Sequence, residues 1–163
     1  MRKSMRWTLG GLAVLVIVGV PVLKVYPGPS DAARIDAALE ASLKASREGR
    51  PGGVLEFLTD KFEINDQVVG TRREIGVAIR NSKPEVEVTN RDAEVFGDDA
   101  KIVSPVRVKV AFMGQPIDQR IDGVTILFKR EPARAFFVLP THTWRIDKVY
   151  LPEGVPLPWS MGN

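Results

Sequence analysis

The first apolar segment of the chain is an unbroken run near its N-terminus. Residues 7–23 read WTLGGLAVLVIVGVPVL without a charge, with three basic residues before them and Lys24 after them. At a rise of about 1.5 Å per residue, a helix over residues 7–26 spans about 30 Å, the thickness of the hydrocarbon core of a bilayer. The segment is apolar on every face of such a helix, which is typical of a membrane span. The pattern therefore predicts one N-terminal transmembrane helix over residues 7–26.

The charges around this segment predict its orientation. Because three basic residues precede it and only one follows closely, the N-terminus stays in the cytoplasm and residues 27–163 lie outside it, in the periplasm or at the cell exterior. A cleaved signal peptide is the alternative, since Ser30 and Ala32 are small residues before a cleavage site at Ala33. Cleavage there would release a secreted domain, but the site lies far beyond the apolar core. We expect a single-pass membrane protein with an extracytoplasmic domain.

After a Pro/Gly/Ser linker over residues 27–30, apolar positions recur at helical spacing. A first helix is predicted over residues 31–48, because three aliphatic residues follow one another every fourth position and Gly49 then ends the pattern. A second helix is predicted over residues 53–61. A third opens with the capping box Thr71-Arg72-Arg73-Glu74 and must end before Pro84. The aliphatic residues of the first helix are Ile35, Leu39 and Leu43.

The remaining segments alternate with a period of two and predict strands. Residues 62–69 read as a short strand interrupted at Asn65-Asp66, and four longer strands follow as an antiparallel meander. The order predicts an α+β domain over residues 31–151, with three helices on one face of a curved, mostly antiparallel sheet. Residues 152–163 form a Pro-rich tail. The four strands are predicted over 85–96, 100–113, 117–130 and 136–151.

The turn Gly114-Gln115 predicts a register for the central hairpin, with Met113 opposite Pro116. In that register one face of the hairpin is apolar and forms the core. The outer face also carries apolar residues, and a sheet with two apolar faces needs a second cover. We expect a homodimer interface there, or a cover formed by the Pro-rich tail. The predicted interface residues are Val103, Val124, Ile126 and Phe128.

The charge balance of the chain excludes one class of partner. The formal net charge is +3, but residues 1–30 hold four basic residues and no acidic one. The other 19 basic residues therefore face 20 acidic ones, a net charge of −1 for residues 31–163. Because the exported domain has no basic excess, we expect no nucleic-acid partner.

The same inventory limits the chemistry of the domain. The chain contains no cysteine and a single histidine, His142. Disulfides and cysteine-ligated zinc are excluded, and a histidine-based metal site is nearly so. No phosphate-binding loop, dinucleotide fingerprint or nucleophile elbow is present, so we expect neither a metal nor a cofactor.

Two short segments carry a family resemblance. Residues 70–75 read GTRREI. They resemble the glycine followed by a helix start that NTF2-like domains have after their first strand. Trp144-Arg145-Ile146 resembles the segment common in their last strand. With the order of elements, the resemblance to the NTF2-like superfamily (SnoaL-like cyclases and ketosteroid isomerases among them) covers residues 31–151. It implies a cystatin-like cone with a half-open cavity and frequent dimers through the sheet, but no particular activity.

Within such a cone, a few polar groups among apolar ones would orient a ligand. His142 is the candidate base, because histidine is the residue type that most often acts as a base near neutral pH. No second catalytic group is visible beside it, so we expect a non-catalytic module that binds a small apolar ligand or a membrane protein. The alternative is a small SnoaL- or isomerase-type enzyme that uses the cavity. The candidate ligand-binding residues are Phe57, Gln119, Thr125, His142 and Trp144.

Overall fold

The computed structural model describes residues 28–112, 115–135 and 139–155. The chain divides into two units between Ser30 and Asp31, and the folded domain is the unit that begins at Asp31. The predicted transmembrane helix over residues 7–26, the first linker residue and residues 156–163 of the predicted tail lie outside the described residues. Among the residues that are described, no helix has the length and apolar character needed to cross a bilayer.

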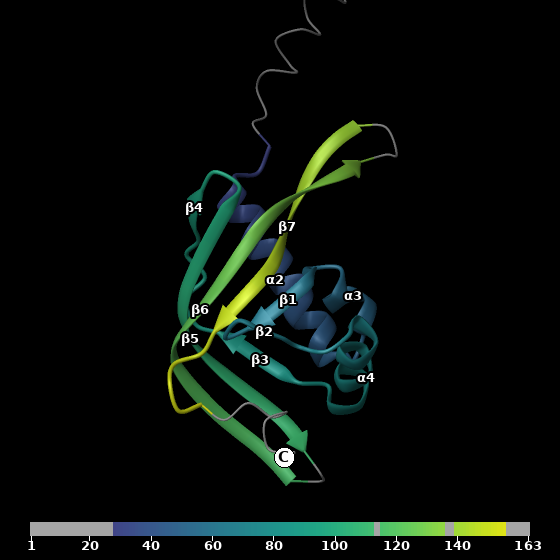
Figure 1. The fold of residues 1–163 in the computed structure, drawn as a ribbon, viewed down its shortest axis with the longest axis vertical. Coiled ribbons are helices and arrows are strands. Elements are labelled where there is room, and N and C mark those ends of the chain that lie inside the picture. Colours follow the sequence, from purple (N-terminus) through teal and green to yellow (C-terminus); the bar gives the residue numbers. More distant parts are fainter. Residues whose placement is uncertain (1–27, 113–114, 136–138, 156–163) are drawn as a thin grey trace, which may run out of the picture. The chain divides into compact units, whose positions relative to one another are not determined.

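Three helices gather on one side of a curved sheet (Figure 1). The first is α2 (Asp31–Arg47), and the aliphatic stripe predicted for it is buried against the sheet. A short helix, α3 (Pro51–Leu55), follows, and Gly49 joins the two in a left-handed conformation with a φ of 64°. The helix α4 (Arg72–Ser82) begins with the predicted capping box, in which Thr71 accepts from the backbone N–H of Glu74 and Glu74 reaches back to Thr71.

Seven strands form one sheet in the order β2-β1-β7-β6-β5-β3, and β4 also pairs with β5. All neighbours are antiparallel except β1 and β7, which are parallel. The hairpins β5–β6 and β6–β7 extend beyond the helices at opposite ends of the domain (Figure 1). The strands are β1 (Leu58–Ile64), β2 (Gln67–Val68), β3 (Glu85–Val88), β4 (Glu94–Phe96), β5 (Asp99–Phe112), β6 (Gln115–Ala135) and β7 (Leu139–Tyr150).

The core lies between α2 and the sheet. Trp144 and Phe128 are each 1% exposed, and Ile35 and Leu39 of α2 pack in the same cluster. These side chains fill the space that a cone-shaped fold can leave open as a cavity. A second, smaller cluster joins the three helices to the start of β1 through Ala45, Val54, Leu58 and Ile79.

The register of the central hairpin differs from the predicted one. Ala111, rather than Met113, lies opposite Pro116, and the pairing then shifts in the middle of the strands. Asp122 and Gly123 of β6 lie opposite the single residue Pro105 of β5, which makes a β-bulge. Gly123 has a φ of 76°, a conformation that favours glycine. One extra residue in β6 exchanges the two faces of the strand beyond it.

This bulge overturns most of the predicted interface. Val124, Ile126 and Phe128 are 2%, 5% and 1% exposed, and all three belong to the core beneath α2. The prediction that they lie on the outer face is wrong, because it assumed one register along the whole hairpin. Val103 does lie on the outer face and is 47% exposed.

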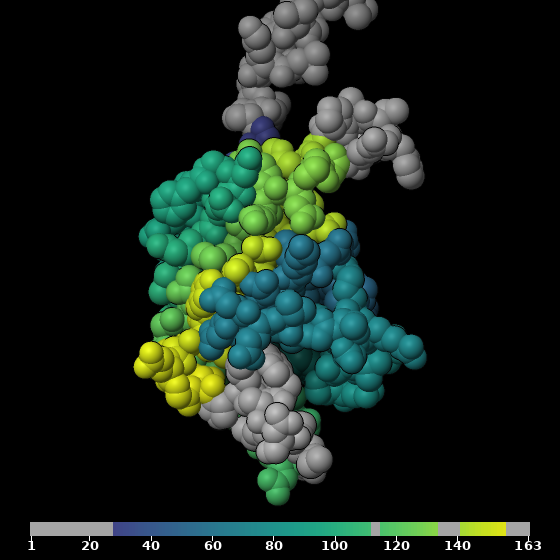
Figure 2. All heavy atoms as spheres, in the orientation of Figure 1, coloured from purple at the N-terminus to yellow at the C-terminus, as the bar shows by residue number. Residues whose placement is uncertain are grey.

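Two further boundaries differ from the predicted ones. The second helix ends at Leu55, and its predicted last residues instead begin β1, where the backbone of Phe57 and Leu58 pairs with β7. The predicted strand over residues 85–96 is two strands, β3 and β4, which pair with separate parts of β5. The interruption of the strand at Asn65-Asp66 is confirmed, since both residues have positive φ and form the β1–β2 turn. In the space-filling view blue atoms lie beside yellow ones (Figure 2), in agreement with the pairing of β1 and β7.

Candidate functional site

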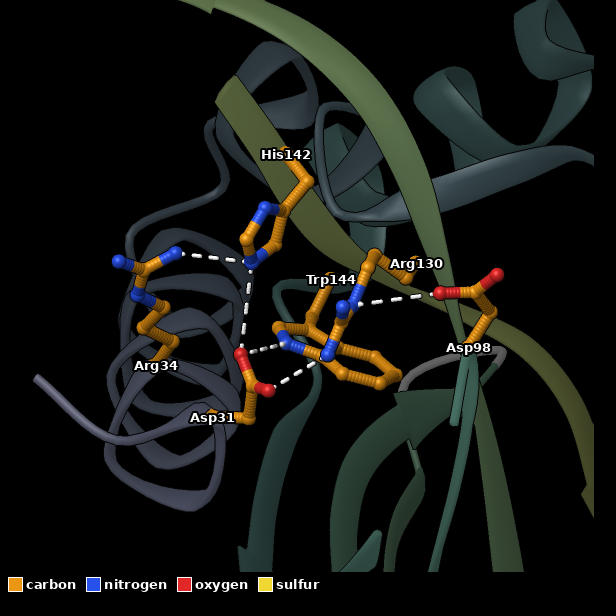
Figure 3. Close-up of polar contacts among 6 residues, drawn as sticks. All are labelled: Asp31, Arg34, Asp98, Arg130, His142 and Trp144. Atoms are coloured by element: carbon orange, nitrogen blue, oxygen red, sulfur yellow. Dashed lines mark hydrogen bonds and ion pairs between the residues drawn. The ribbon is translucent and has the colours of Figure 1, made fainter. Parts of the chain in front are cut away.

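A group of linked polar contacts lies where α2 begins (Figure 3). Asp31, the first residue of α2, faces the pair of strands β6 and β7. Arg130 lies directly opposite Trp144 in that pair, and His142 is two residues before Trp144 on the same side of β7. The alternation of the two strands therefore brings three functional side chains to one face, and the helix supplies the carboxylate.

The carboxylate of Asp31 is the centre of this group. Its Oδ1 accepts a hydrogen bond from Trp144 Nε1 at 3.2 Å, and its Oδ2 accepts one from Arg130 Nη2 at 2.5 Å. The indole hydrogen bond has the largest effect on the pKa of Asp31 and lowers it. Burial, the next largest effect, raises this pKa, and His142 and the charge of Arg130 lower it further, so the net shift is downward. Asp31 is therefore an anion at neutral pH, at the end of the helix where the dipole favours one.

Arg130 links this carboxylate to a second one. Its guanidinium lies over the ring of Trp144, 5.0 Å from the ring centroid, in a cation–π contact. Its Nε lies 3.6 Å from Asp98 Oδ1, too far for a hydrogen bond, and it has no hydrogen-bond partner among the described residues. The backbone N–H of Arg130 donates to the carbonyl of Asp98 at 2.8 Å. The turn between β4 and β5 is thereby fixed beside the site.

His142 lies between a hydrogen-bond donor, Arg34, and a hydrogen-bond acceptor, Asp31, and both contact its Nε2 atom. Its Nε2 is 2.9 Å from Arg34 Nη1 and 3.4 Å from Asp31 Oδ1. A guanidinium can only donate, so Nε2 binds Arg34 when it carries no proton. A proton on Nε2 would instead favour Asp31. His142 can therefore serve one of these partners at a time.

This arrangement holds an acid–base pair, Asp31 and His142. The two best-formed hollows of the described residues are lined by other side chains. The space beneath the group is filled by Trp144 and the rest of the core. As it stands, the group ties the start of α2 to β6 and β7.

The structure places the predicted ligand-binding residues in different parts of the domain. His142 and Trp144 come together in the Asp31 group. Phe57 is half-buried at the start of β1, where its carbonyl accepts from the N–H of Ile146 at 2.7 Å. Gln119 is exposed beside Val108, and Thr125 is half-buried on the outer face opposite Val103. The last three therefore share no site with His142.

Sequence reasoning missed Asp31, Arg34, Arg130 and Asp98 as members of one group. In the sequence alone, an aspartate at position 31 is typical of a helix start, and Asp98 beside Gly97 is typical of a turn. One signal was available, because Arg130 and Trp144 lie on the two strands that flank the last turn and are similarly far from it. Their direct pairing depends on the register of β6 and β7, which the sequence pattern did not reveal.

The larger hollow, of about 450 Å³, lies on the open face of the sheet across β3, β5 and β6. Arg107 crosses it to make two hydrogen bonds with Asp118, from Nε and from Nη2, both at 2.7 Å. This fork raises the pKa of Arg107 and lowers the pKa of Asp118. The hollow presents both signs of charge to solvent. It is lined by Glu87, Thr89, Val106, Arg107, Asp118 and Arg120.

Comparison with known proteins yields matches at the level of the fold. No family model and no curated protein matches the chain. An NTF2-like protein with a cystatin-like fold from Novosphingobium aromaticivorans is 14% identical with a TM-score of 0.54, over 98% of this chain and 99% of that one. An NTF2-like protein of unknown function in nutrient uptake from Rhodospirillum rubrum is 16% identical with a TM-score of 0.55, over 71% and 94%.

A ketosteroid isomerase-like protein from Erwinia carotovora atroseptica is also similar. It is 14% identical with a TM-score of 0.50, over 79% of this chain and 100% of that one. At such identities the similarity shows the fold alone. The domain thus has the NTF2-like, cystatin-like α+β fold with a curved sheet, which confirms this part of the predicted fold class.

Proposed function

We propose that this chain is a membrane-tethered NTF2-like module that binds or assembles other proteins outside the cytoplasm. The observation that carries the tether is the place of Asp31 in the fold. The signal-peptide alternative cuts the chain between Ala32 and Ala33 and would remove Asp31 from the mature domain. Trp144 Nε1 and Arg130 would then lose the carboxylate that both of them bind. This cost supports an uncleaved segment that remains as an anchor over residues 7–26.

A binding role without catalysis is supported by the packing of the domain. Trp144 and Phe128 occupy the space between α2 and the sheet, where an enzyme of this fold would need room for a substrate. The polar groups nearest to that space are bound to one another, as Asp31 and Arg130 are. This arrangement supports recognition of a partner on the outer surface of the domain rather than binding of a substrate inside it.

The open face of the sheet is the surface that we assign to assembly. It carries the larger hollow, the exposed Val103 and charges of both signs, among them Arg120 and Asp122 on one strand. Mixed charges around a small apolar centre favour a specific protein partner, and a second copy of this chain could offer the complementary charges. The dimer expected from the sequence thus remains a proposal, now centred on Val103.

Chemical cross-linking tests the assembly surface. The chain has no cysteine, so Val103→Cys introduces a single thiol on the open sheet face. With a short bis-maleimide, the full chain in its membrane should give a cross-linked dimer. Val68→Cys on β2, which is 64% exposed and lies outside this surface, is the control and should stay monomeric. Equal cross-linking at the two positions, or none at Val103→Cys, would refute this surface.

One observation favours a second candidate function. Asp31 Oδ1 and His142 Nε2 lie 3.4 Å apart, so a short movement would give them the hydrogen-bond distance that an acid–base pair needs. An enzyme of SnoaL or isomerase type would require the core beneath them to open. If His142→Ala leaves turnover and ligand affinity unchanged for every compound that the wild-type chain converts or binds, the enzyme reading is wrong.

A further inference from the structure

The exposed side of α4 carries arginines that the fold does not use. Arg73, Val77 and Arg80 recur at i, i+4 and i+7 and are exposed, while Ile75 and Ile79 face the second core cluster. Val77 is a large apolar side chain that is 47% exposed between the two arginines. Among the described residues, neither arginine forms an ion pair. We call these three residues the outer face of α4.

The neighbouring Arg72 shows what a structural arginine looks like here. Its guanidinium donates to Asp60 Oδ1 at 2.8 Å and to the carbonyl of Leu55 at 2.7 Å, and so ties α4 to α3 and β1. Arg73 has no such role. It also lies in the first turn of the helix, where the dipole is positive and repels a cation. Its presence is therefore unexplained by the stability of the fold.

No acidic residue of α4 neutralises this face. The one acidic residue of the helix is Glu74, and its Oε2 accepts from the backbone N–H and the hydroxyl of Thr71, at 2.7 and 3.0 Å. Beyond the helix, Lys83 adds a further exposed cation at the C-cap. Residues 31–163 carry a net charge of −1, so the positive charge at α4 is a local concentration rather than an average property.

We propose that the outer face of α4 binds anionic lipid headgroups of the membrane that holds the chain. This inference rests on the proposed tether, because a tethered domain meets the bilayer surface at high effective concentration. Guanidinium groups pair with phosphate through two parallel hydrogen bonds, and a valine between them can enter the boundary between headgroups and acyl chains. Basic side chains around an apolar one are the usual composition of a helix that lies on a negatively charged bilayer.

A fluorescent label on this face tests the contact. Val77→Cys gives the full chain its one thiol, which is labelled with a polarity-sensitive dye and reconstituted into vesicles of phosphatidylcholine with or without 30% phosphatidylglycerol. We expect the emission to shift to the blue, and lipid-borne quenchers to act on it, in the anionic vesicles alone. High salt should reverse both effects, because the contact is electrostatic.

Charge variants distinguish binding through the outer face of α4 from a general electrostatic attraction between the domain and anionic vesicles. Arg73→Gln with Arg80→Gln should shift the equilibrium toward the undocked state about 25-fold, since each basic residue near such a surface contributes about fivefold. Lys44→Gln with Lys61→Gln removes the same charge from exposed positions outside α4 and should have little effect. Equal losses in the two pairs would overturn the proposal.

The same experiment distinguishes failure of the tether from failure of the lipid face. A chain that floats with neutral vesicles but shows no dye response to anionic ones is tethered, and its α4 does not bind lipid. A chain that floats with no neutral vesicle yet gives the dye response when anionic vesicles are added has the lipid face without the tether. Absence of the dye response under both conditions refutes the role assigned to Arg73 and Arg80.

Discussion

The bulge between β5 and β6 makes a quantitative prediction about two adjacent residues. Phe128 is 1% exposed beneath α2, whereas Leu127 is half-buried on the opposite face, beside Lys101 and Lys148. Without the bulge the two residues would exchange places. Truncation of each to alanine therefore measures which side chain lies in the core.

The expected costs differ by a wide margin. Removal of a fully buried phenylalanine costs about 3–5 kcal/mol, because the lost transfer free energy is joined by the cost of the cavity that remains. Leu127 is only partly buried and leaves a smaller cavity in the core, so Leu127→Ala should cost less, about 1 kcal/mol. With a urea dependence of about 2 kcal/mol per molar, Phe128→Ala should lower the unfolding midpoint by about 2 M and Leu127→Ala by about 0.5 M.

The assay is urea unfolding of the full chain in detergent, followed by far-UV circular dichroism, which reports on the sheet and helices together. The unfolding midpoints can be compared if the free energy of unfolding falls with urea concentration at the same slope in the wild type and both variants. A cost for Leu127→Ala equal to or larger than that for Phe128→Ala would refute the register described here, and with it the assignment of Phe128 to the core.

Three further predictions follow from single residues. Gly123→Ala should cost about 1 kcal/mol in urea unfolding, because the φ of 76° is unfavourable for a residue with a Cβ while no atom crowds that position. Thr71→Ala should cost about 1 kcal/mol by the same measurement, since it removes the side-chain acceptor of the α4 capping box, whereas Thr71→Ser should cost little. The pKa of Asp31 is lowered from 3.8 in the folded chain, so its stabilising effect is complete above pH 3.8 and is lost as the pH falls through the lower folded pKa. In the Asp31→Asn variant the free energy of unfolding should therefore depend less on pH over that acidic range. A pH dependence equal to that of the wild type would contradict the role of Asp31.

Local features of the fold could be predicted because local sequence determines them. The aliphatic residues of α2 lie within one helix, and the Thr71–Glu74 capping box and the Asn65-Asp66 turn each involve a few neighbouring residues. The face of β6 could not be predicted in the same way. Both parities are apolar around Val124, so the bulge decides between them, and Gly123 inside the strand was the one local sign of it.

The candidate site was harder to predict, because tertiary structure assembles it. Asp31 and Trp144 are 113 positions apart, and their hydrogen bond depends on where α2 crosses the sheet. An aspartate in the first turn of a helix has an ordinary explanation, and so does a tryptophan in a core. His142 and Trp144 were found because two residues of the same strand with equal parity share a face.

The intact mass of the chain isolated from cell membranes tests the central claim most directly. The account predicts the full-length chain in the membrane fraction, resistant to extraction with carbonate, with residues 1–32 retained and Asp31 in place beside Trp144 and Arg130. A chain that begins at Ala33 and is recovered in the soluble extracytoplasmic fraction would contradict the tether, and with it the lipid contact proposed for a domain held at the membrane.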